Sequence, residues 1–394
     1  MKKFSFIPTR AAGLERLKTF LPSAGNNYAA LRNYDLGQNN HTNVSLLSPY
    51  IRHRSLTEIE VLKSVLCYHS KKSSEKFVQE VFWRTYWKGW LEMRPTVWAA
   101  YQSKLNRLGD DLKTQSGFRK SWENACQGET GIECFDSWAK ELFDTGYLHN
   151  HARMWFASIW IHTLKLPWEL GADFFLRNLL DGDPASNTLG WRWVGGAQTF
   201  GKTYLASTQN IQKYTKDRFS PTNLSLTPTM ISGSKNPERK PISFDHIPCK
   251  SNNYAVLLHS EDMDWSVLKE FFPNAVKIFC LLPNNDPRPL MSSDLQHNFK
   301  KTLLKDSLNR WEDKLGLVSV IENLNALEND AFDVIYTNYI PIGHTRDLVE
   351  SYKFKNTKII KIANSFDRKA WPFATHGFFR FKEQIDNLLN QLDE

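Results

Sequence analysis

Two groups of residues place carboxylates beside aromatic rings or in a tight turn. Glu80, Trp83 and Trp87 are spaced so that they share one face of a predicted helix. The turn Asp181-Gly182-Asp183-Pro184 holds two carboxylates close together. Such groups often serve only packing or turn formation. Aromatic rings in near contact can also pass electrons, because each ring can be oxidised transiently, and the chain has 14 Trp.

Other kinds of catalytic site do not occur in the sequence. It has no Ser-His-Asp or Cys-His arrangement for nucleophilic catalysis and no HExxH metal motif. It also lacks the G-x-G-x-x-G and P-loop patterns that bind nucleotide phosphates. The 5 Cys are scattered, which excludes a disulfide scaffold and a paired CxxC zinc site. These cysteines predict a reducing, cytoplasmic compartment.

The charge balance favours an anionic partner. Lys and Arg outnumber Asp and Glu by 50 to 42, which gives a net charge of +8. A basic surface suits nucleic acid, although many basic proteins bind none. The sequence has no run of apolar residues long enough to span a membrane, and its first residues lack the apolar core and cleavage site of a signal peptide. We therefore expect neither a membrane span nor a secretion signal.

The chain divides into two parts at a predicted linker over residues 216–252, which are rich in Pro, Ser, Thr and Asn. Residues 1–215 have helical apolar spacing and predict an all-α domain. Residues 253–394 alternate apolar runs with helical stretches, which predicts an α/β domain with a doubly wound, Rossmann-like parallel sheet. The expected strands are 254–259, 276–282, 317–321, 332–338 and 357–363.

Local signals set the expected helix boundaries in the first part. The pattern Ser55-Leu-Thr-Glu58 predicts a capping box that opens a helix ending near His69. A second helix is expected from Ser73 or Ser74 to the residue before Pro95. A third, over about 148–166, is apolar nearly all round, which is typical of a buried helix.

Several longer segments resemble the photolyase/cryptochrome flavoproteins. Residues 145–154, TGYLHNHARM, and residues 180–193, LDGDPASNTLGWRW, resemble the FAD site of that family. Residues 44–51, VSLLSPYI, resemble its phosphate-binding segment, and residues 80–84, EVFWR, resemble its substrate-facing helix. The resemblance covers about residues 10–200 and keeps the order of the motifs. It implies a helical FAD-binding domain.

The resemblance also implies how FAD would be held. Ser45, Leu47 and Ser48 would bind the pyrophosphate, and Arg153 would pair with a carboxylate at the flavin's polar edge, because a buried carboxylate needs a partner. Asn187 would lie against the flavin N5. The residues implied to bind FAD are Tyr28, Ser45, Leu47, Ser48, Arg84, Asn150, Arg153, Asp181, Gly182, Asp183 and Asn187. No residue after the linker identifies a second, antenna chromophore.

Two tryptophans resemble members of the family's electron-transfer chain, through which the flavin is photoreduced. By position, Trp191 and Trp168 match its first two members. The third is missing, since residues 112–115 read LKTQ. The candidates for its replacement are Trp155, Trp160 and Tyr147. For the two tryptophans, packing is the favoured interpretation.

The resemblance predicts DNA repair. In photolyases acting on cyclobutane pyrimidine dimers, a flipped lesion stacks on Trp and is hydrogen-bonded by Glu. The residues of this chain implied to be catalytic are Glu80, Trp83, Met154, Asn187 and Trp193. We therefore expect a deoxyribodipyrimidine photolyase, a lyase in which reduced flavin passes an electron to the dimer under blue light.

Two departures from the family keep other functions open. Residues 204–214 differ from the Arg-Ile-Phe-Asn-Pro segment that meets DNA in the best-known bacterial photolyases, and His151 replaces a DNA-contacting Arg. Fewer cations would weaken phosphate binding, although Lys202 and Lys213 could compensate. The alternatives are a cryptochrome-like blue-light photoreceptor with a protein partner, or a flavin-binding protein without a light function.

The order of the two domains is also unusual for that family. Its members usually begin with the α/β domain and place the FAD domain second. Here the helical part comes first and the strand-rich part follows the linker. The sequence therefore suggests a reversed domain order, which a long linker would permit.

Overall fold

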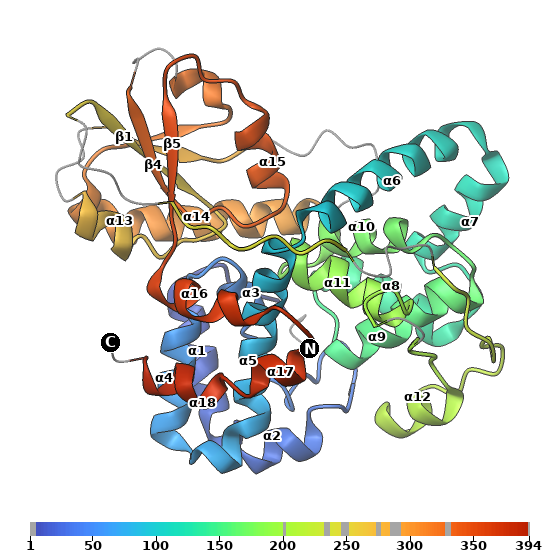
Figure 1. Ribbon diagram of the computed structural model, residues 1–394. Coiled ribbons are helices and arrows are strands. Elements are labelled where there is room, and N and C mark those ends of the chain that lie inside the picture. The colour runs from blue at the N-terminus through green and yellow to red at the C-terminus, as the bar shows by residue number, and fades with distance from the viewer. Residues whose placement is uncertain are drawn as a thin grey trace.

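The computed structural model describes residues 5–199, 202–231, 237–245, 252–272, 277–283, 293–327 and 332–392. A helical part and a sheet part lie side by side (Figure 1). The helices before the linker are α1 (Arg10–Phe20), η1 (Leu21–Ser23), α2 (Asn26–Leu31), α3 (Ser48–Arg52), α4 (Glu58–Tyr68), α5 (Lys71–Glu92), α6 (Pro95–Thr114), α7 (Ser116–Gln127), α8 (Glu133–Thr145), α9 (Asn150–Ser158), the π-helical turn η2 (Ile159–Thr163), α10 (Trp168–Asn178), α11 (Pro184–Val194) and α12 (Thr208–Tyr214).

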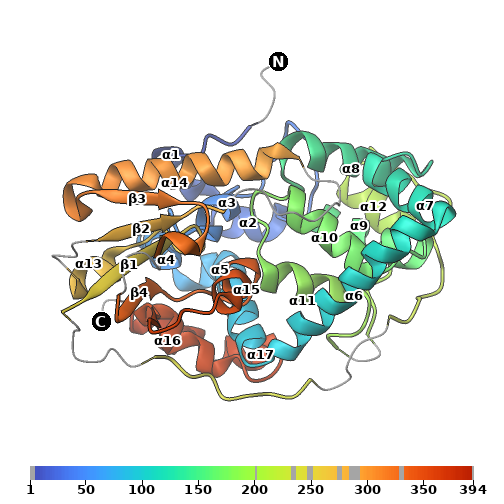
Figure 2. The ribbon, with the colours of Figure 1, turned by 90° about the horizontal axis from the view of Figure 1, so that it is seen from above.

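The second part is built on a parallel sheet of five strands in the order β3-β2-β1-β4-β5, seen along its edge in Figure 2. Central β1 pairs with both β2 and β4 in parallel register. The strands are β1 (Tyr254–His259), β2 (Ile278–Leu281), β3 (Val318–Ile321), β4 (Val334–Asn338) and β5 (Lys358–Ile362), and the connecting helices are α13 (Ser266–Phe271), α14 (Asp294–Leu315), η3 (Leu324–Leu327) and α15 (His344–Ser351). The predicted fold class, a helical domain followed by a parallel α/β domain, is confirmed.

The last helices pack on the helical part. They are α16 (Ser365–Ala370), η4 (Trp371–Phe373), α17 (Phe378–Lys382) and α18 (Ile385–Asn390), and they lie beside α4 and α5 in Figure 1. A Cβ on Gly89 of α5 would come within 2.9 Å of the Cα of Trp371, so only glycine permits this approach. Residues 365–392 thus extend the helical body, although the sequence groups them with the sheet.

The segment between the two parts runs along the outside of the helical body (Figure 2). Its described residues form neither helix nor strand. Several contacts anchor it. Among them, Lys240 donates its backbone N–H to the carbonyl of Met93 at 2.8 Å, and Ile231 packs so closely on Gly195 that a Cβ there would meet its Cδ1 at 2.3 Å. This connection is therefore anchored to the surface of the body that it crosses.

The cap of α4 lies two residues later than the sequence pattern indicated. Thr57 is the N-cap and accepts from the backbone N–H of Glu60, whose side chain closes the capping box. The predicted Ser55/Glu58 box is wrong, because Glu58 is buried and pairs with Arg54 instead. No helix within the described ranges is long and apolar enough to cross a membrane.

Candidate cofactor site

The start of α11 is held by a cluster of cations. Asp183 is its N-cap and accepts from the backbone N–H of Ser186 at 2.8 Å. The Oδ2 of Asp183 lies 3.8 Å from both Lys88 and Arg84 and 3.9 Å from Arg52. Burial alone would raise the pKa of Asp183, but these cations outweigh it and hold that pKa at about 2. Burial lowers the pKa of Lys88 to about 8. The turn thus presents a charged, desolvated cluster.

A bidentate ion pair fixes the turn to α9. The guanidinium of Arg153 donates to both carboxylate oxygens of Asp181, at 3.0 and 2.9 Å, and its Nε donates to the carbonyl of Leu148 at 2.9 Å. Between the two aspartates, a Cβ on Gly182 would lie 2.9 Å from the carbonyl oxygen of Leu176, so the turn requires glycine. The predicted pairing of Arg153 with one of the two carboxylates is present, and the partner is Asp181.

The segment before α3 leaves two hydroxyl groups accessible. Ser45 and Ser48 are partly exposed, whereas the side chain of Leu47 is buried in the core. The Oγ of Ser45 accepts from the backbone N–H of Leu47 at 3.4 Å. Leu46 between them has a φ of +57°, which turns the chain sharply. The leucine anchors this turn while the serines face outward.

One side of α11 is open within the helical body. Asn187, Gly190 and Trp193 are partly exposed, whereas Leu189 and Trp191 on the other side are buried. A Cβ on Gly190 would meet no atom within 4 Å. The helix α11 packs against both α5 and α9, on which Arg84 and Met154 are also partly exposed.

The amide of Asn187 is already oriented by the fold. Its Nδ2 donates to the carbonyl of Ala172 in α10 at 2.7 Å, which leaves its oxygen and second N–H for another group. Tyr28 and Asn150, which were also expected to bind FAD, differ in exposure. Tyr28 is buried between Phe20 and Phe77, whereas Asn150 is exposed at the start of α9. The ring of Tyr28 therefore packs in an aromatic cluster at this place.

The open side of α11 gives a direct prediction for cofactor binding. Gly190→Ala is expected to keep the fold and to stabilise α11 by about 0.5–1 kcal/mol, since alanine is the better helix former and the added Cβ meets nothing. Gly190→Leu is expected to keep the fold but to reduce flavin retention by filling the open space. Thermal unfolding and the flavin-to-protein absorbance ratio check both. Equal flavin content in the Leu and Ala variants would contradict the placement.

The residues implied to meet a substrate are already engaged with side chains that the sequence motifs did not indicate. Glu80 pairs with Arg32 of α2, and burial raises the pKa of Glu80. The ring of Trp83 stacks on Phe378 of α17, with centroids 3.7 Å apart. Trp193 stacks on Tyr204 at 5.6 Å.

Among these partners, Arg32 could have been found from the sequence, because it follows the candidate residue Tyr28 by one helical turn. Lys88, which lies beside Asp183, follows the candidate residue Arg84 at the same spacing. Phe378 has no such signal, since it is almost 300 residues from Trp83 in the chain.

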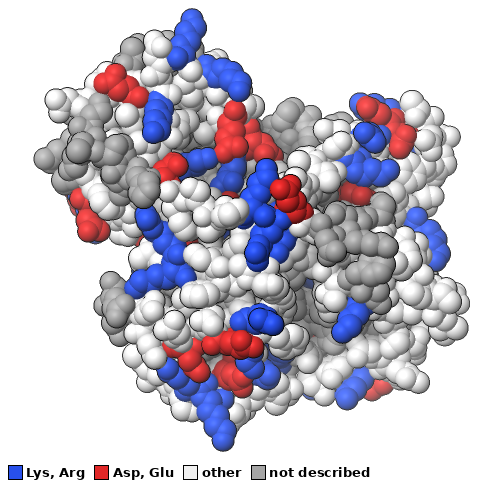
Figure 3. Space-filling view, viewed as in Figure 1, with Lys and Arg blue, Asp and Glu red and all other residues white. Residues whose placement is uncertain are grey.

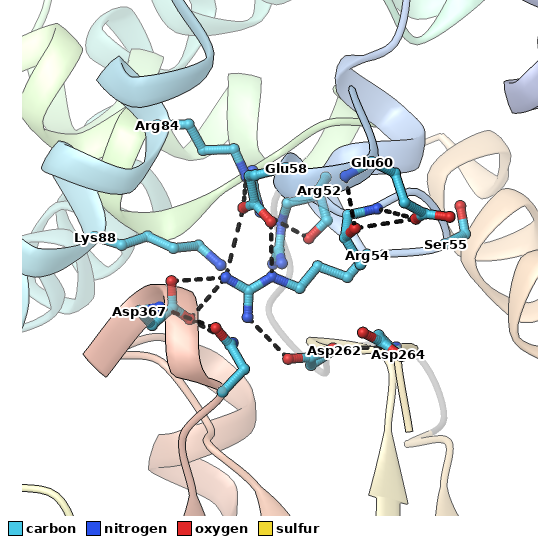
Figure 4. A network of polar contacts seen from close by, with 12 residues as sticks. Arg52, Arg54, Ser55, Glu58, Glu60, Arg84, Lys88, Asp262, Asp264 and Asp367 are labelled. Carbon is cyan, nitrogen blue, oxygen red and sulfur yellow. Dashed lines mark hydrogen bonds and ion pairs between the residues drawn. The ribbon is translucent and has the colours of Figure 1, made fainter. Parts of the chain in front are cut away.

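A buried ion network joins the helical part to the sheet part (Figure 4). The guanidinium of Arg54 lies between three carboxylates: Glu58 at 3.0 Å, Asp262 after β1 at 2.8 Å and Asp367 of α16 at 2.6 Å. Nearby, Arg52 reaches Glu261 at 2.7 Å. The carboxyl end of β1, where a Rossmann-like sheet would offer a ligand crevice, is therefore covered by the helical part.

Two described cavities lie away from the candidate FAD-binding residues. One, of about 320 Å³, is lined by residues of α15 and β5, among them Tyr352, Phe354 and Lys361. The other, of about 350 Å³, lies at the seam, by which we mean the boundary between the helical part and the sheet part. It is lined by residues that include Arg10 and Arg310. The open side of α11 is thus a separate feature.

Comparison with known proteins assigns the helical part. Residues 77–219 match the sequence model of a family described as the FAD binding domain of DNA photolyase. The chain is 29% identical over 199 residues to a deoxyribodipyrimidine photo-lyase of Alkalihalophilus pseudofirmus, which covers 49% of this chain and 39% of that protein. It is 32% identical over 156 residues to that of Streptomyces griseus, which covers 39% and 32% respectively. The chain therefore spans about two-fifths or less of the length of these curated relatives.

A solved cryptochrome of Synechocystis aligns with a TM-score of 0.41 and 26% identity, over 52% of this chain and 43% of that one. The family match and the sequence relatives define the helical part as a flavoprotein domain whose cofactor is FAD. Residues 77–219 therefore form a domain of the kind found in the photolyase/cryptochrome flavoproteins.

The side chains around α11 fit this cofactor. A Cβ on Gly190 would meet no atom within 4 Å, and the oriented amide of Asn187 has its oxygen and a second N–H left for a hydrogen bond. The partly exposed Ser45 and Ser48 and the guanidinium of Arg84 are donors of the kind that a pyrophosphate needs.

Proposed function

We propose that this protein splits cyclobutane pyrimidine dimers in DNA with light and reduced FAD. The observation that carries the proposal is the arrangement on α5, where Glu80 and Trp83 lie one turn or less from Arg84, beside the candidate flavin residues. A carboxyl group and an indole on the same helix face can hydrogen-bond and stack a base that has been flipped out of DNA.

FAD supplies the light-driven one-electron chemistry, and the chain's own residues supply binding and position. Ser45, Leu47 and Ser48 hold the pyrophosphate, and Asn187 orients the flavin ring. The remaining proposed FAD contacts are Tyr28, Arg84, Asn150, Arg153, Asp181, Gly182 and Asp183.

Around the lesion, Met154 and Trp193 line the space next to Trp83. Burial raises the pKa of Glu80, and the Arg32 guanidinium beside it opposes that shift. Paired with Arg32, the carboxylate can accept a hydrogen bond from a pyrimidine N–H.

DNA would meet a surface of mixed charge. Figure 3 shows Lys and Arg side chains distributed among Asp and Glu side chains over one face of the molecule. The net charge of +8 favours the polyanion overall. Binding through scattered cations predicts an affinity that falls as salt rises.

A repair assay tests the proposal. The flavin-loaded, chemically reduced protein is illuminated with blue light beside an oligonucleotide that carries one thymine dimer, and dimer loss is followed by chromatography. Glu80→Ala is expected to slow repair about tenfold, since a hydrogen bond to a charged group contributes about 1.5–3 kcal/mol. Trp83→Ala is expected to weaken dimer binding, because base stacking contributes about 1–3 kcal/mol.

The matched control is Trp90→Phe on the same helix. Trp90 is buried and carries the guanidinium of Arg94 over its ring at 4.1 Å, away from the site. This variant is expected to repair dimers at the rate of the unchanged protein. No repair by the reduced, flavin-loaded protein under light would refute the proposal.

A specific observation favours a second function, that of a blue-light photoreceptor without repair activity. Both rings implied to hold the lesion are already stacked within the chain, Trp83 on Phe378 and Trp193 on Tyr204. A lesion must then use their remaining faces or displace these partners. Flavin photoreduction without any dimer loss would identify the photoreceptor, and a signalling protein would then be its partner.

A further inference from the structure

The loop that follows β1 binds the end of α3 residue by residue. Residues 260–263 belong to the sheet part and residues 52–54 to the helical part, and each residue of the loop contacts this short segment. The contacts are the Nδ1–H of His53 donating to the carbonyl of Ser260 at 2.7 Å, Arg52 paired with Glu261 at 2.7 Å, Arg54 paired with Asp262 at 2.8 Å, and the backbone N–H of Met263 donating to the carbonyl of His53 at 2.8 Å. The sheet part therefore fixes the segment from which the side chain of Arg52 extends.

Glu261 is itself held by three elements of the sheet part. Its Oε1 accepts from the hydroxyl of Thr345, in the first turn of α15, at 2.8 Å. Its backbone N–H donates to the Nδ1 of His259 in β1 at 3.2 Å, and the Nε2–H of that ring donates to the carbonyl of Asn338 in β4 at 3.0 Å. Burial alone would raise the pKa of Glu261, but Arg52 outweighs it and holds that pKa well below its usual range. Glu261 is thus a fixed anion.

Arg52 connects this anion to the turn before α11. Its Nε donates to the carbonyl of Gly182 at 2.8 Å and lies 3.9 Å from the Oδ2 of Asp183. Arg52 is only 4% exposed, so its charge needs a carboxylate nearby. Of the two carboxylates beside it, Glu261 is the closer, and Asp183 is shared with two other cations. Glu261 therefore keeps the guanidinium aligned on the Gly182 carbonyl.

The loop before α15 contacts the same turn directly. A Cβ on Gly343 would meet the Cγ of Pro184 at 2.6 Å, so a larger residue there would collide with the start of α11. Gly343 lies two residues before Thr345, so one short segment of the sheet part contacts both Pro184 and Glu261. The sheet part thus reaches the turn at two points, directly at Pro184 and through Arg52 at Gly182.

We propose that Glu261 is a positioning residue for FAD, because through Arg52 it sets the turn at Gly182 and Asp183. The sheet part thereby controls how tightly the helical part holds its cofactor, although none of the proposed FAD contacts lies in the sheet part. When Glu261 is lost, the buried guanidinium moves toward Asp183, its remaining carboxylate, and releases the Gly182 carbonyl. This inference rests on the proposed FAD contacts of that turn.

Titration of the apoprotein with FAD, followed by flavin fluorescence, tests the inference. Glu261→Ala is expected to weaken FAD binding about tenfold, which corresponds to about 1.4 kcal/mol. Glu261→Gln keeps an acceptor for Arg52 and is expected to limit the loss to about threefold or less. Thr345→Val removes only the hydroxyl that orients Glu261, and it is expected to resemble Glu261→Gln.

A role of Glu261 through its charge alone predicts the opposite result. A negative charge near the anionic pyrophosphate of FAD opposes binding, so its removal would tighten binding equally in Glu261→Ala and Glu261→Gln. Tighter binding in both variants would therefore overturn the positioning role, as would an unchanged affinity in Glu261→Ala or no recovery in Glu261→Gln.

The matched control is Asp306→Ala at another place on the seam. Asp306 also belongs to the sheet part, and it accepts from the backbone N–H of Arg10 in α1 at 3.0 Å. Its side chain is 22% exposed, against 13% for Glu261. This variant is expected to leave FAD affinity unchanged, and thermal unfolding checks that every variant folds. Equal loss of FAD in Asp306→Ala and Glu261→Ala would also overturn the inference.

Arg153→Ala separates this inference from the placement of the cofactor, because it disturbs the same turn from within the helical part. If Arg153→Ala weakens FAD binding and Glu261→Ala does not, the role of Glu261 alone is wrong. If neither variant weakens it, the proposed FAD contacts of the turn are wrong as well.

Discussion

Arg54→Ala is expected to lower the free energy of unfolding by about 3–5 kcal/mol, because it leaves buried carboxylates without their cation. The side chain of Arg54 is only 6% exposed and pairs with Glu58, Asp262 and Asp367, which come from both parts of the protein. Loss of this one cation therefore loosens the seam itself. Urea unfolding, followed by circular dichroism, measures the change in the free energy of unfolding. The measurement is made at about pH 7.5, within the pH range in which proteins are usually most stable.

The effect of this substitution should depend on pH. Burial alone would raise the pKa of Glu58, but Arg54 and Arg84 outweigh it and hold that pKa at about 2. A depressed pKa stabilises the fold above the pKa of the unfolded carboxyl, near 4, and this contribution is lost as pH falls toward 2. Without Arg54, Glu58 binds a proton more readily in the folded state. The difference between the variant and the unchanged protein should therefore shrink as the pH is lowered toward about 4.

The pKa of Asp262 is shifted in the opposite direction, so its contribution to stability changes with pH in the opposite way. Burial raises its pKa to about 6 despite Arg54, so its contribution to stability is present below the pKa of the unfolded carboxyl and is lost as pH rises through 6.

Arg119→Ala is the control, since the ion pair of Arg119 with Glu123 is largely exposed and its loss should change stability by less than about 0.5 kcal/mol. Arg54→Ala unfolding at the same urea concentration as Arg119→Ala would contradict the role of the seam network.

Arg153→Ala is expected to weaken FAD binding about tenfold or more. The bidentate pair with Asp181 fixes the turn before α11, and removing the cation leaves a buried carboxylate that must protonate or move. Either response shifts the turn that positions Asn187, and 1.4 kcal/mol of lost interaction is a tenfold loss of affinity. Arg153→Lys keeps the charge but only one of the parallel hydrogen bonds, so an intermediate loss is expected.

Titration of the apoprotein with FAD, followed by flavin fluorescence, measures this effect. The matched control is Arg346→Ala. Arg346 is also mostly buried and pairs with Glu92 at 3.0 Å, but at the seam with the sheet part. It is expected to lower stability and leave FAD affinity unchanged. If both variants lose FAD equally, the loss reflects general destabilisation and the specific role of the Arg153 pair is wrong.

Local sequence patterns predicted best the features that depend on residues close together in the chain. The spacing of apolar residues predicted the helical part and the parallel sheet, because helix and strand periods depend on residues within one or two turns. The FAD-binding domain was implied by the resemblance of the ordered motifs at 145–154 and 180–193 to a known family. The pairing of Arg153 with an aspartate followed from chemistry, since a buried carboxylate needs a cation.

One local pattern, the predicted Ser55/Glu58 capping box, was wrong because two pairs of residues compete to cap the same helix. Ser55 and Glu58 have the right spacing for a capping box, and so do Thr57 and Glu60. The second pair forms the box because Arg54 and Arg84 draw Glu58 into the buried network. Arg54 itself owes its place to Asp262 and Asp367, more than 200 residues away along the chain.

By itself, the sequence determined the two kinds of secondary structure, since each depends on short-range spacing. The resemblance of its ordered motifs to a known family implied the cofactor domain. Only the tertiary structure decided which side chains close on the site. It stacked Phe378 on Trp83 and set Tyr204 on Trp193. These contacts join distant segments, and packing selects them from many aromatic residues that look alike in the sequence.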